Sequence, residues 1–407
     1  MPTYPALLQQ LDDNERSLLA LLCTHGPVTR QQMQELTGFS SSSMHRLTGR
    51  LEKNGLIMSV GEADSAGGRK PMRYGIGRDK GLLAGVELSR TEVRVMLCRP
   101  DLSPLESIQF PMTASHDPAS TVDAIAITLQ SALGRLGLSK NEIPGIGLGT
   151  SGVIDREQGM ILFTLGFFHD SWQQVPIRAM LSERLGLPVH IDNGANMAVL
   201  AEAIAGCGQG RNIAYVHMGM GVRTGIASKG KVVRFKQAQE DVFGHMTVDL
   251  HGEPCHCGNR GCITTYASFP AFARMLYGEH AASAHPRNAA KIGAHIEQAE
   301  REAEAVRKRM EAAGHAAGAG LANLIRLADL EAVILGGPLI RYAKIFRESA
   351  IQTARASLGK RSGRSATFLL DGHFGPWTIA MGAALHVYGL HVGLERDAGK
   401  GAPPCRR

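Results

Sequence analysis

The sequence lacks any run of about eighteen consecutive apolar residues, so no membrane-spanning helix and no membrane partner are expected. Its first residues, MPTYPALLQQLDDNERS, contain no charged segment followed by an apolar run, so they do not resemble a secretory signal peptide. Cysteine is scarce and odd in number. Three of the seven cysteines lie within residues 255–262, which argues against a disulfide framework. Together these absences favour the cytoplasm.

The composition is that of an ordinary globular protein. With 407 residues, 44% hydrophobic and 20% charged, the chain is long enough for two or three domains. Many of its 48 glycines lie in short clusters such as Gly145-Ile146-Gly147-Leu148-Gly149, which are typical of strand ends in an α/β fold. A net charge of +7 is compatible with nucleic-acid binding but is weak support for it.

Residues 1–80 have the pattern of a winged helix-turn-helix domain. Apolar spacing predicts a helix at 14–25. Thr29 and Ser40 are suitable N-caps for two further helices, ending near residues 36 and 53. Two strand candidates, 56–60 and 72–76, follow on either side of a loop. This order predicts three helices and a β-hairpin.

In such domains the second helix of the turn motif lies in the major groove of DNA. Short hydroxyl side chains and arginines at its start can reach phosphates or base edges. Cations at the tip of the wing can enter the minor groove, where the negative potential is enhanced. The alternative is an ordinary surface helix and a solvated turn. The predicted DNA contacts are Ser40, Ser41, Ser42, Ser43, His45, Arg46 and Arg50 on the helix, and Arg69 and Lys70 in the loop.

Beyond residue 80 the pattern is that of two related α/β lobes. A glycine-punctuated hairpin at 82–97 is echoed by one at 213–233. We expect residues 81–192, together with about 376–390, to form the first lobe and 193–375 to form the second. Residues 391–407 are expected to be a disordered tail.

Residues 244–262, GHMTVDLHGEPCHCGNRGC, carry a dense set of metal ligands. The glycine-rich loop supplies three thiolates, whereas a closed zinc site needs four ligands. His245, His251 and His256 are the candidates for the fourth. We favour His245, because it is far enough upstream to close a loop over the ion. The predicted cofactor is structural Zn²⁺ held by His245, Cys255, Cys257 and Cys262.

This combination resembles the ROK family, which contains repressors, open reading frames and sugar kinases. The family motif is Gly-His, a spacer and Cys-X-Cys-Gly-X-X-Gly-Cys, and residues 244–262 match it. The resemblance implies a two-lobed actin-like (ribonuclease-H-like) domain. Members with an N-terminal winged helix resemble repressors of N-acetylglucosamine, glucose and xylose genes.

The sequence departs from the family's kinases in the catalytic loop. In these kinases an Asn-Asp-Ala-Asn loop supplies the base that takes the proton of the sugar hydroxyl. Residues 193–196 read Asn-Gly-Ala-Asn, so Gly194 stands at the position of the base. Asp192 is one residue away and could reach the sugar only if the loop shifted. We therefore assign no catalytic residue and expect no enzymatic activity.

The two loops that bind nucleotide phosphates in the kinases also differ in this sequence. The kinase Asp-Ile-Gly-Gly-Thr phosphate turn appears here as Glu87-Leu88-Ser89-Arg90-Thr91. The second phosphate loop reads Gly219-Met220-Gly221-Val222-Arg223-Thr224. The side chains of Met220 and Arg223 would crowd phosphates that need bare backbone N–H groups, although Arg223 could still bind an anion.

The sugar site implied by the family has lost all three of its acids. Either the pocket accepts another ligand, anionic or less hydroxylated, or it is vestigial and a protein partner controls the chain. We favour a small carbohydrate-like effector. The positions implied to bind it are Asn193, Val242, His245 and Thr264, with Gly194 at the missing base.

The functional hypothesis is a transcriptional regulator, a repressor of carbohydrate uptake or catabolism genes. A palindromic double-stranded DNA operator would match a homodimer or homotetramer. The alternatives are a ROK-type sugar kinase and a regulator controlled by a protein partner without a small ligand.

Overall fold

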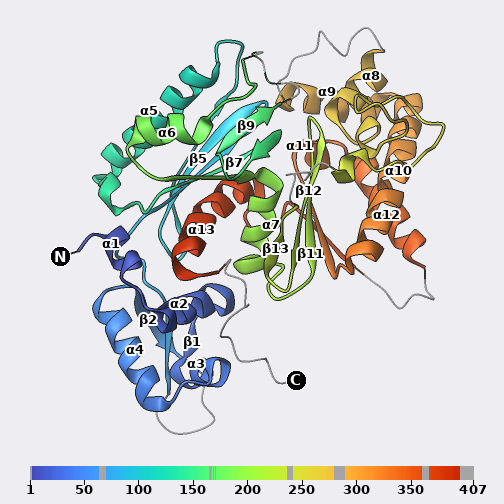
Figure 1. The fold of residues 1–407 in the computed structure, drawn as a ribbon. Helices are drawn as coiled ribbons and strands as arrows, with labels where there is room; N and C mark the ends of the chain where they lie inside the picture. The colour runs from blue at the N-terminus through green and yellow to red at the C-terminus, as the bar shows by residue number, and fades with distance from the viewer. Residues whose placement is uncertain are drawn as a thin grey trace.

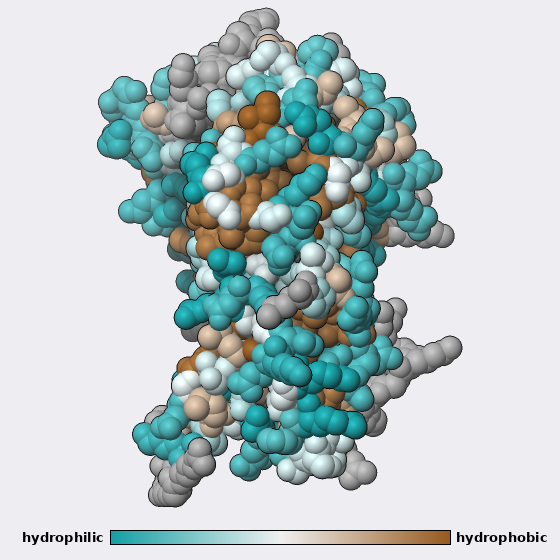
Figure 2. Space-filling view, turned by 90° about the vertical axis from the view of Figure 1, so that its left-hand side faces the viewer, coloured by the Kyte–Doolittle hydropathy of each residue, from teal (hydrophilic) through white to brown (hydrophobic). Residues whose placement is uncertain are grey.

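The structure is a computed structural model that describes residues 2–63, 70–164, 167, 169, 171–235, 242–278, 289–359 and 366–394. Figure 1 shows a small N-terminal module (blue) below two larger α/β lobes. Figure 2 shows that the surface of the small module is mostly hydrophilic on the face in view, while hydrophobic residues gather above it on the larger body. Within these described ranges, no helix is long and apolar enough to cross a membrane.

The N-terminal module is a winged helix-turn-helix domain, as the sequence predicted. Thr29 and Ser40 both act as N-caps, accepting hydrogen bonds from the backbone N–H groups of Gln32 and Ser43. Its short sheet has the order β1-β3-β2, with antiparallel pairs. The prediction missed α1 and β1, which are only six and two residues long. The elements are α1 (Tyr4–Gln9), α2 (Asp13–His25), β1 (Val28–Thr29), α3 (Arg30–Thr37), α4 (Ser41–Lys53), β2 (Ile57–Glu62) and β3 (Met72–Ile76).

The first lobe is built on a five-stranded sheet of order β10-β7-β4-β5-β6. Strands β4, β5 and β6 form an antiparallel meander, and β7 and β10 join β4 in parallel. The elements are β4 (Leu83–Leu88), β5 (Glu92–Cys98), β6 (Pro104–Pro111), α5 (Pro118–Leu136), β7 (Ile146–Thr150), β8 (Val153–Asp155), β9 (Met160–Phe163), α6 (Ile177–Leu185) and β10 (Val189–Asn193).

The second lobe repeats this topology. Its sheet has the order β13-β12-β11-β14-β15, again three antiparallel strands followed by two parallel ones. The predicted echo between the two hairpins is therefore a duplication of the whole sheet. The elements are α7 (Gly194–Ile204), β11 (Ile213–Met218), β12 (Val222–Ser228), β13 (Lys231–Val233), α8 (Phe269–Tyr277), α9 (Ala289–Glu302), α10 (Glu304–Ala328), β14 (Ala332–Gly336), α11 (Pro338–Tyr342), α12 (Lys344–Leu358) and β15 (Thr367–Leu370).

The last helix, α13 (Thr378–Val392), returns to the first sheet and lies against β4 and β7. The approach is so close that a Cβ on Gly85 would lie 1.9 Å from the carbonyl oxygen of Ala380. Helix α13 runs two residues into the segment predicted to be a tail, because Val392 is buried and anchors its end. Residues 395–407 lie outside the described ranges, and the predicted domain boundaries stay a prediction.

One hydrophobic core joins the winged helix to the larger body. Leu18, Leu19 and Leu22 of α2 belong to the same buried cluster as Met381 and Leu385 of α13. Arg16 of α2 also donates a hydrogen bond to the backbone oxygen of His391. Helix α13 (red in Figure 1) lies directly above the module and between the two lobes. The module is therefore anchored to the helix that contacts both lobes.

Candidate functional site

Helix α4 presents a polar face to solvent. Met44, Leu47, Thr48 and Leu51 are buried, which turns Ser41, Ser42, His45 and Arg46 outward. The Ser40 hydroxyl caps the helix and lies 3.0 Å from the hydroxyl of Ser43. Ser40 and Ser43 therefore shape the start of the helix, while the exposed side chains that follow form the surface available to DNA.

Among the predicted DNA contacts in the described part of the chain, Arg50 stands out because it is ion-paired within the module. Its Nε lies 2.5 Å from a carboxylate oxygen of Glu15, and its guanidinium also pairs with Asp12. These contacts tie α4 to the start of α2. Arg46 is exposed and makes no ion pair with a residue that the structure describes. Of the two arginines predicted to contact DNA from this helix, Arg46 is therefore the one available to phosphate.

The wing is formed by β2 and β3, which pair in an antiparallel hairpin. Lys70 lies just before β3 and is exposed, as expected for a phosphate contact. Arg69 lies outside the described residues. The DNA-contact roles of all these side chains stay a prediction.

A group of four side chains could hold a metal ion. Ligand atoms of His245, Cys255, Cys257 and Cys262 all lie within 4.8 Å of one another. His245 ends a short 3₁₀ turn (Val242–His245), and Cys262 immediately precedes another (Ile263–Thr265). The loop folds tightly at Gly261, where φ is +62° and a Cβ would lie 1.7 Å from the carbonyl oxygen of Asp249.

His245 approaches the thiols more closely than its neighbour His256. The Nδ1 atom of His245 is 3.5 Å from Sγ of Cys255, against 3.8 Å for that of His256. His256 instead stacks edge-on against the His245 ring, with 4.9 Å between the centroids. The geometry agrees with His245 as the fourth ligand.

Asp192, at the end of β10, is held between two arginines. One of its carboxylate oxygens accepts from Nε of Arg156 and the other from Nε of Arg234, each at 2.6 Å. Further donors to the first oxygen are the backbone N–H of Asn193 and the side-chain amide of Asn196, at 2.7 and 3.1 Å. The carboxyl is 1% exposed, and although burial alone would raise its pKa, Arg234 and Arg156 lower it.

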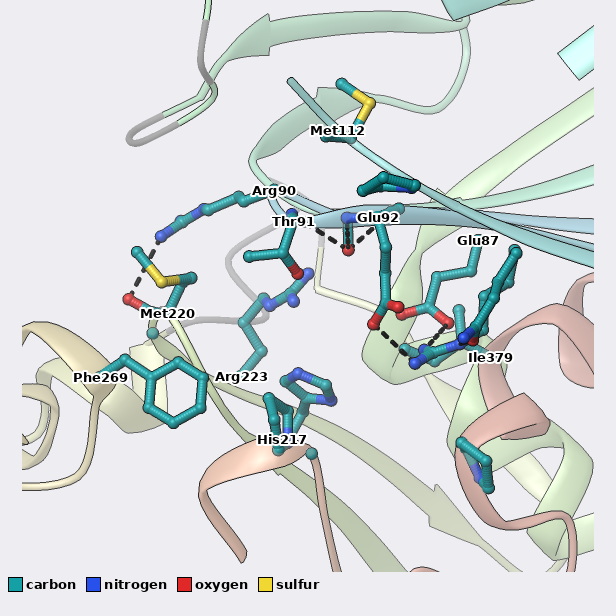
Figure 3. Close-up of a pocket in the computed structure, with 18 of the residues that line it drawn as sticks. Glu87, Arg90, Thr91, Glu92, Met112, His217, Met220, Arg223, Phe269 and Ile379 are labelled. Carbon is teal, nitrogen blue, oxygen red and sulfur yellow. Dashed lines mark hydrogen bonds and ion pairs between the residues drawn. The ribbon is translucent and has the colours of Figure 1, made fainter. Parts of the chain in front are cut away.

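A cavity of about 870 Å³ opens between the two lobes. It is lined by the turn after β4, by β12 and by the start of α11, and Figure 3 shows these residues facing one another. Its charged and polar lining residues include Glu87, Arg90, Thr91, Glu92, Arg94, Gln109, His217, Arg223 and Arg341.

Some of these charges are matched within the cleft wall. Arg94 pairs with Glu87 at 2.9 Å and with Glu92 at 2.6 Å (Figure 3). Arg90 reaches across to the other lobe and donates to the backbone oxygen of Met220 at 3.4 Å. The pKa of His217 is held well below its usual range, first by burial and then by the arginines that surround it, so this imidazole is neutral.

Residues 83–388 match the protein family described as the ROK family, and residues 11–58 match a winged helix-turn-helix DNA-binding domain. The first match covers most of the chain. The chain belongs to the ROK family.

Relatives of this ROK chain include both regulators and kinases. A xylose repressor from Caldicellulosiruptor bescii is 26% identical, over 88% of this chain and 89% of the repressor. A glucokinase from Streptomyces coelicolor is 32% identical, over 64% of this chain and 82% of the kinase. The crystal structure of a ROK family transcriptional regulator, a homologue of the E. coli MLC protein, aligns with a TM-score of 0.72 at 21% identity. That alignment covers 94% of this chain and 96% of the other.

The ROK domain does not gather the four predicted effector residues around the described cleft. The side chain of Asn193 caps α7 by accepting from the N–H of Ala195 at 2.9 Å. Thr264 is almost completely buried, Val242 is 52% exposed and His245 belongs to the cysteine cluster. Their role toward an effector stays a prediction.

Sequence reasoning missed two features of this ROK domain. Arg156 and Arg234 are 36 and 42 residues from Asp192, and no local pattern connects them. The second missed feature is the cleft between the lobes, whose only signal in the sequence was the presence of Arg90 and Arg223 in the two phosphate loops. Their presence was interpreted as a loss of nucleotide contacts, and the structure adds that both side chains line one cavity.

Proposed function

We propose that this ROK protein is a DNA-binding transcriptional repressor of carbohydrate uptake or catabolism genes. The observation that carries the proposal is a winged helix with an exposed polar recognition helix, built into one core with a ROK domain. The likeness to xylose repressors over most of the chain supports the choice of sugar genes. A carbohydrate-like molecule is the proposed effector.

The alternative of a sugar kinase is disfavoured by three local observations. Gly194 has no side chain that could take a proton. Asp192 is charge-paired with two arginines and has a lowered pKa, so it is a poor base and is not directed at a substrate. Arg90 crosses between the two phosphate loops to Met220. We propose that the chain has no phosphoryl-transfer activity, even though glucokinases are among its relatives.

Helix α13 is the proposed connection between effector and DNA. Pro376, just before the helix, and Ile379, in its first turn, line the cleft, whereas Leu385 and Tyr388 pack in the core of the winged helix. A ligand that changes lobe closure would therefore move the base of the DNA-binding module. This couples two sites through one rigid element.

We propose Zn²⁺ as the ion of the His245 site. Tetrahedral zinc with Zn–S distances of about 2.3 Å separates its sulfur ligands by about 3.8 Å. The sulfur atoms of Cys257 and Cys262 are 3.6 Å apart, which fits that requirement. Four protein ligands would close the site, so the ion would be structural: His245 and the three thiolates would fix the loop of residues 245–262.

We further propose that the protein is a homodimer or homotetramer, because a palindromic operator matches two-fold protein symmetry. We also propose that it acts in the cytoplasm.

Mobility-shift titrations with DNA from upstream of the protein's own gene test the regulator. Specific binding is expected to weaken as salt rises, and Arg46→Ala is expected to reduce the salt slope by about one phosphate contact. Arg184→Ala is the matched control, because Arg184 is exposed on α6, far along the chain from the winged helix. Absence of any sequence-dependent binding would refute the proposal.

Two assays separate the alternatives. ATP turnover over a panel of sugars would reveal a kinase. A thermal-shift screen in which no carbohydrate stabilises the protein would favour control by a protein partner.

A further inference from the structure

Arg30 joins three elements of the winged helix-turn-helix module. It is the first residue of α3, directly after the N-cap Thr29. Its Nε donates a hydrogen bond to Oγ1 of Thr48 in α4, at 2.9 Å. Its guanidinium lies over the ring of Tyr74 in β3, 4.7 Å from the ring centroid. One side chain therefore connects the first helix of the turn motif, the recognition helix and the wing.

Thr48 offers a fixed acceptor on the recognition helix. Its side chain is completely buried, and its hydroxyl donates within α4 to the backbone oxygen of Met44 at 2.9 Å. A threonine hydroxyl has one proton to donate and two lone pairs that accept. Because the proton is used inside α4, a lone pair is left for Arg30. The hydrogen bond therefore holds Arg30 at a fixed place relative to the backbone of α4.

Tyr74 offers a fixed surface on the wing. It is 6% exposed and lies in the central strand of the short sheet, opposite Val28 of β1 and Ser59 of β2. A guanidinium over the face of an aromatic ring is attracted by the negative charge of that face. The contact therefore holds the wing strand against the start of α3 and, through Thr48, against α4.

The chemistry of these contacts differs from that of a residue that only fills space. Arg30 is half-buried, both of its partners are neutral, and no carboxylate in the described part of the chain pairs with its guanidinium. Placing a cation in such a position costs desolvation energy that an apolar side chain would avoid. Arginine adds geometry, because its rigid planar head can donate to a hydroxyl and stack on a ring at the same time.

A second arginine holds the other flank of the recognition helix. Arg50 pairs with Asp12 and Glu15 of α2. Positions 48 and 50 of a helix point about 200° apart around its axis, so the two arginines act on different sides of α4. Arg50 fixes α4 relative to α2, whose leucines share a core with α13. Arg30 fixes α4 relative to the wing.

The angle between α4 and the wing matters because the two elements contact different parts of a duplex. A recognition helix lies in the major groove, and cations of a wing can enter the minor groove. Figure 1 shows α3 and α4 at the lower end of the module, away from the two lobes. Hydrogen bonds to base edges weaken steeply when their geometry is poor, whereas phosphate contacts carry no sequence information. A misplaced wing should therefore reduce sequence discrimination more than general affinity for DNA.

We infer that Arg30 is a positioning residue for operator recognition, which sets the angle between the recognition helix and the wing without contacting the DNA itself. The inference rests on the proposed function, because it assigns the residue a part in sequence-specific binding. It adds a residue that lies outside the set of predicted DNA contacts.

Competition binding with the full-length protein tests this role. Two duplexes of equal length are the probes: the one that the wild type selects from a random pool, and a scrambled version of it. The measured quantity is the ratio of the two affinities. Arg30→Met should lower this ratio by about tenfold, the effect of about one lost base contact, with little change in affinity for the scrambled duplex. Arg30→Lys keeps the charge but lacks the planar head, so it should also lower the ratio.

Two matched controls use the same module. Arg78→Met removes an exposed cation that lines a cavity between the module and the lobes, and it should leave the ratio unchanged. Tyr74→Phe keeps the ring and should also leave the ratio unchanged, whereas Tyr74→Leu removes the ring and should lower it. Melting curves show that each variant is folded at the temperature of the assay. If Arg30→Met does not fold, the tyrosine pair tests the same contact.

Three results would overturn the inference. An unchanged ratio in Arg30→Met, Arg30→Lys and Tyr74→Leu would mean that the contacts stabilise the fold and do not tune recognition. Equal weakening on both duplexes, with the salt slope reduced by about one, would mean that Arg30 contacts a phosphate directly. A full ratio in Arg30→Lys would mean that charge matters and geometry does not.

The failure of the proposed function looks different. A wild type that shows no preference between the two duplexes would refute sequence-specific binding, and this inference with it. A wild type that discriminates, with Arg30 variants that discriminate equally well, would refute this inference alone.

Discussion

Replacing Asp192 by asparagine should destabilise the protein severely. The carboxylate is 1% exposed and lies between two guanidinium groups at 2.6 Å each. The amide would leave Arg156 and Arg234 as two partly buried cations facing a neutral group. Removing one partner of a buried ion pair typically costs about 3–5 kcal/mol. The arginine side chains are 20% and 26% exposed, so solvent screens part of their interaction with the carboxylate. We therefore expect the free energy of unfolding to fall by about 3 kcal/mol.

Urea unfolding of the wild type and of Asp192→Asn at neutral pH measures this loss. Asp123→Asn is the matched control, because Asp123 pairs with Arg184 at the same 2.6 Å but is 56% exposed, and its loss should stay below about 1 kcal/mol. Adding Arg234→Gln to Asp192→Asn should recover part of the stability, because it removes one of the two cations that face the neutral amide. If Asp192→Asn lowered the free energy of unfolding no more than Asp123→Asn, the two ion pairs of Asp192 would contribute nothing to stability. That result would refute the reasoning.

The same pair has a defined pH dependence. The folded pKa of Asp192 lies below its unfolded value of about 4. The carboxylate therefore contributes its full stability above the unfolded pKa, and this contribution is lost as the pH falls through the lower folded pKa. The gap between wild type and Asp192→Asn should be constant from neutral pH down to about pH 5 and should shrink in stronger acid. If the stability difference between wild type and Asp192→Asn stayed constant in strong acid, the destabilisation would come from the shape of the amide and not from the missing charge.

Three further predictions concern other parts of the chain. Gly194→Asp should fold, because a Cβ there would meet the Ile379 side chain at 3.4 Å and the Thr150 carbonyl oxygen at 3.6 Å, which are both ordinary contacts. It should still show no ATP-dependent sugar phosphorylation while the phosphate loops remain altered, and activity in a coupled assay would contradict this. Gly147→Ala should lower the melting temperature markedly in calorimetry, because its Cβ would lie 1.8 Å from the carbonyl oxygen of Ala383, whereas Gly134→Ala, with open space around it, should be neutral or stabilising. Chelation, or Cys257→Ser, should reduce bound zinc in elemental analysis and increase proteolysis within residues 245–262, while Cys23→Ser should retain the metal.

Local features of the fold were predictable because they are encoded locally. The side chains of Thr29 and Ser40 predicted the starts of two helices, and both residues cap these helices in the structure. The spacing of the cysteines predicted that their side chains would come together as a group able to hold a metal ion. The duplication of the sheet was visible as two similar hairpins, since each hairpin is the first part of one lobe.

Pairings between distant residues were not predictable. Arg50 belongs to the recognition helix by sequence, but in the structure its guanidinium is bound by Asp12 and Glu15 of the preceding helix. From sequence, Asp192 was considered only as a carboxylate one residue from the position of the kinase base, whereas in the structure it pairs with arginines more than 30 residues away on either side. Only the tertiary fold brings such charges together, and one sequence carries no record of the contact.

The shared core of α2 and α13 has a consequence for how the protein is made. The helices of the winged module are synthesised first, but Met381, Leu385 and Tyr388, which complete their core, come near the end of the described chain. Domains commonly fold in order as they leave the ribosome. Part of the core of the DNA-binding head is therefore completed only after α13 has been synthesised. A chain that ends before residue 378 leaves the face of α2 that packs against α13 without its partner.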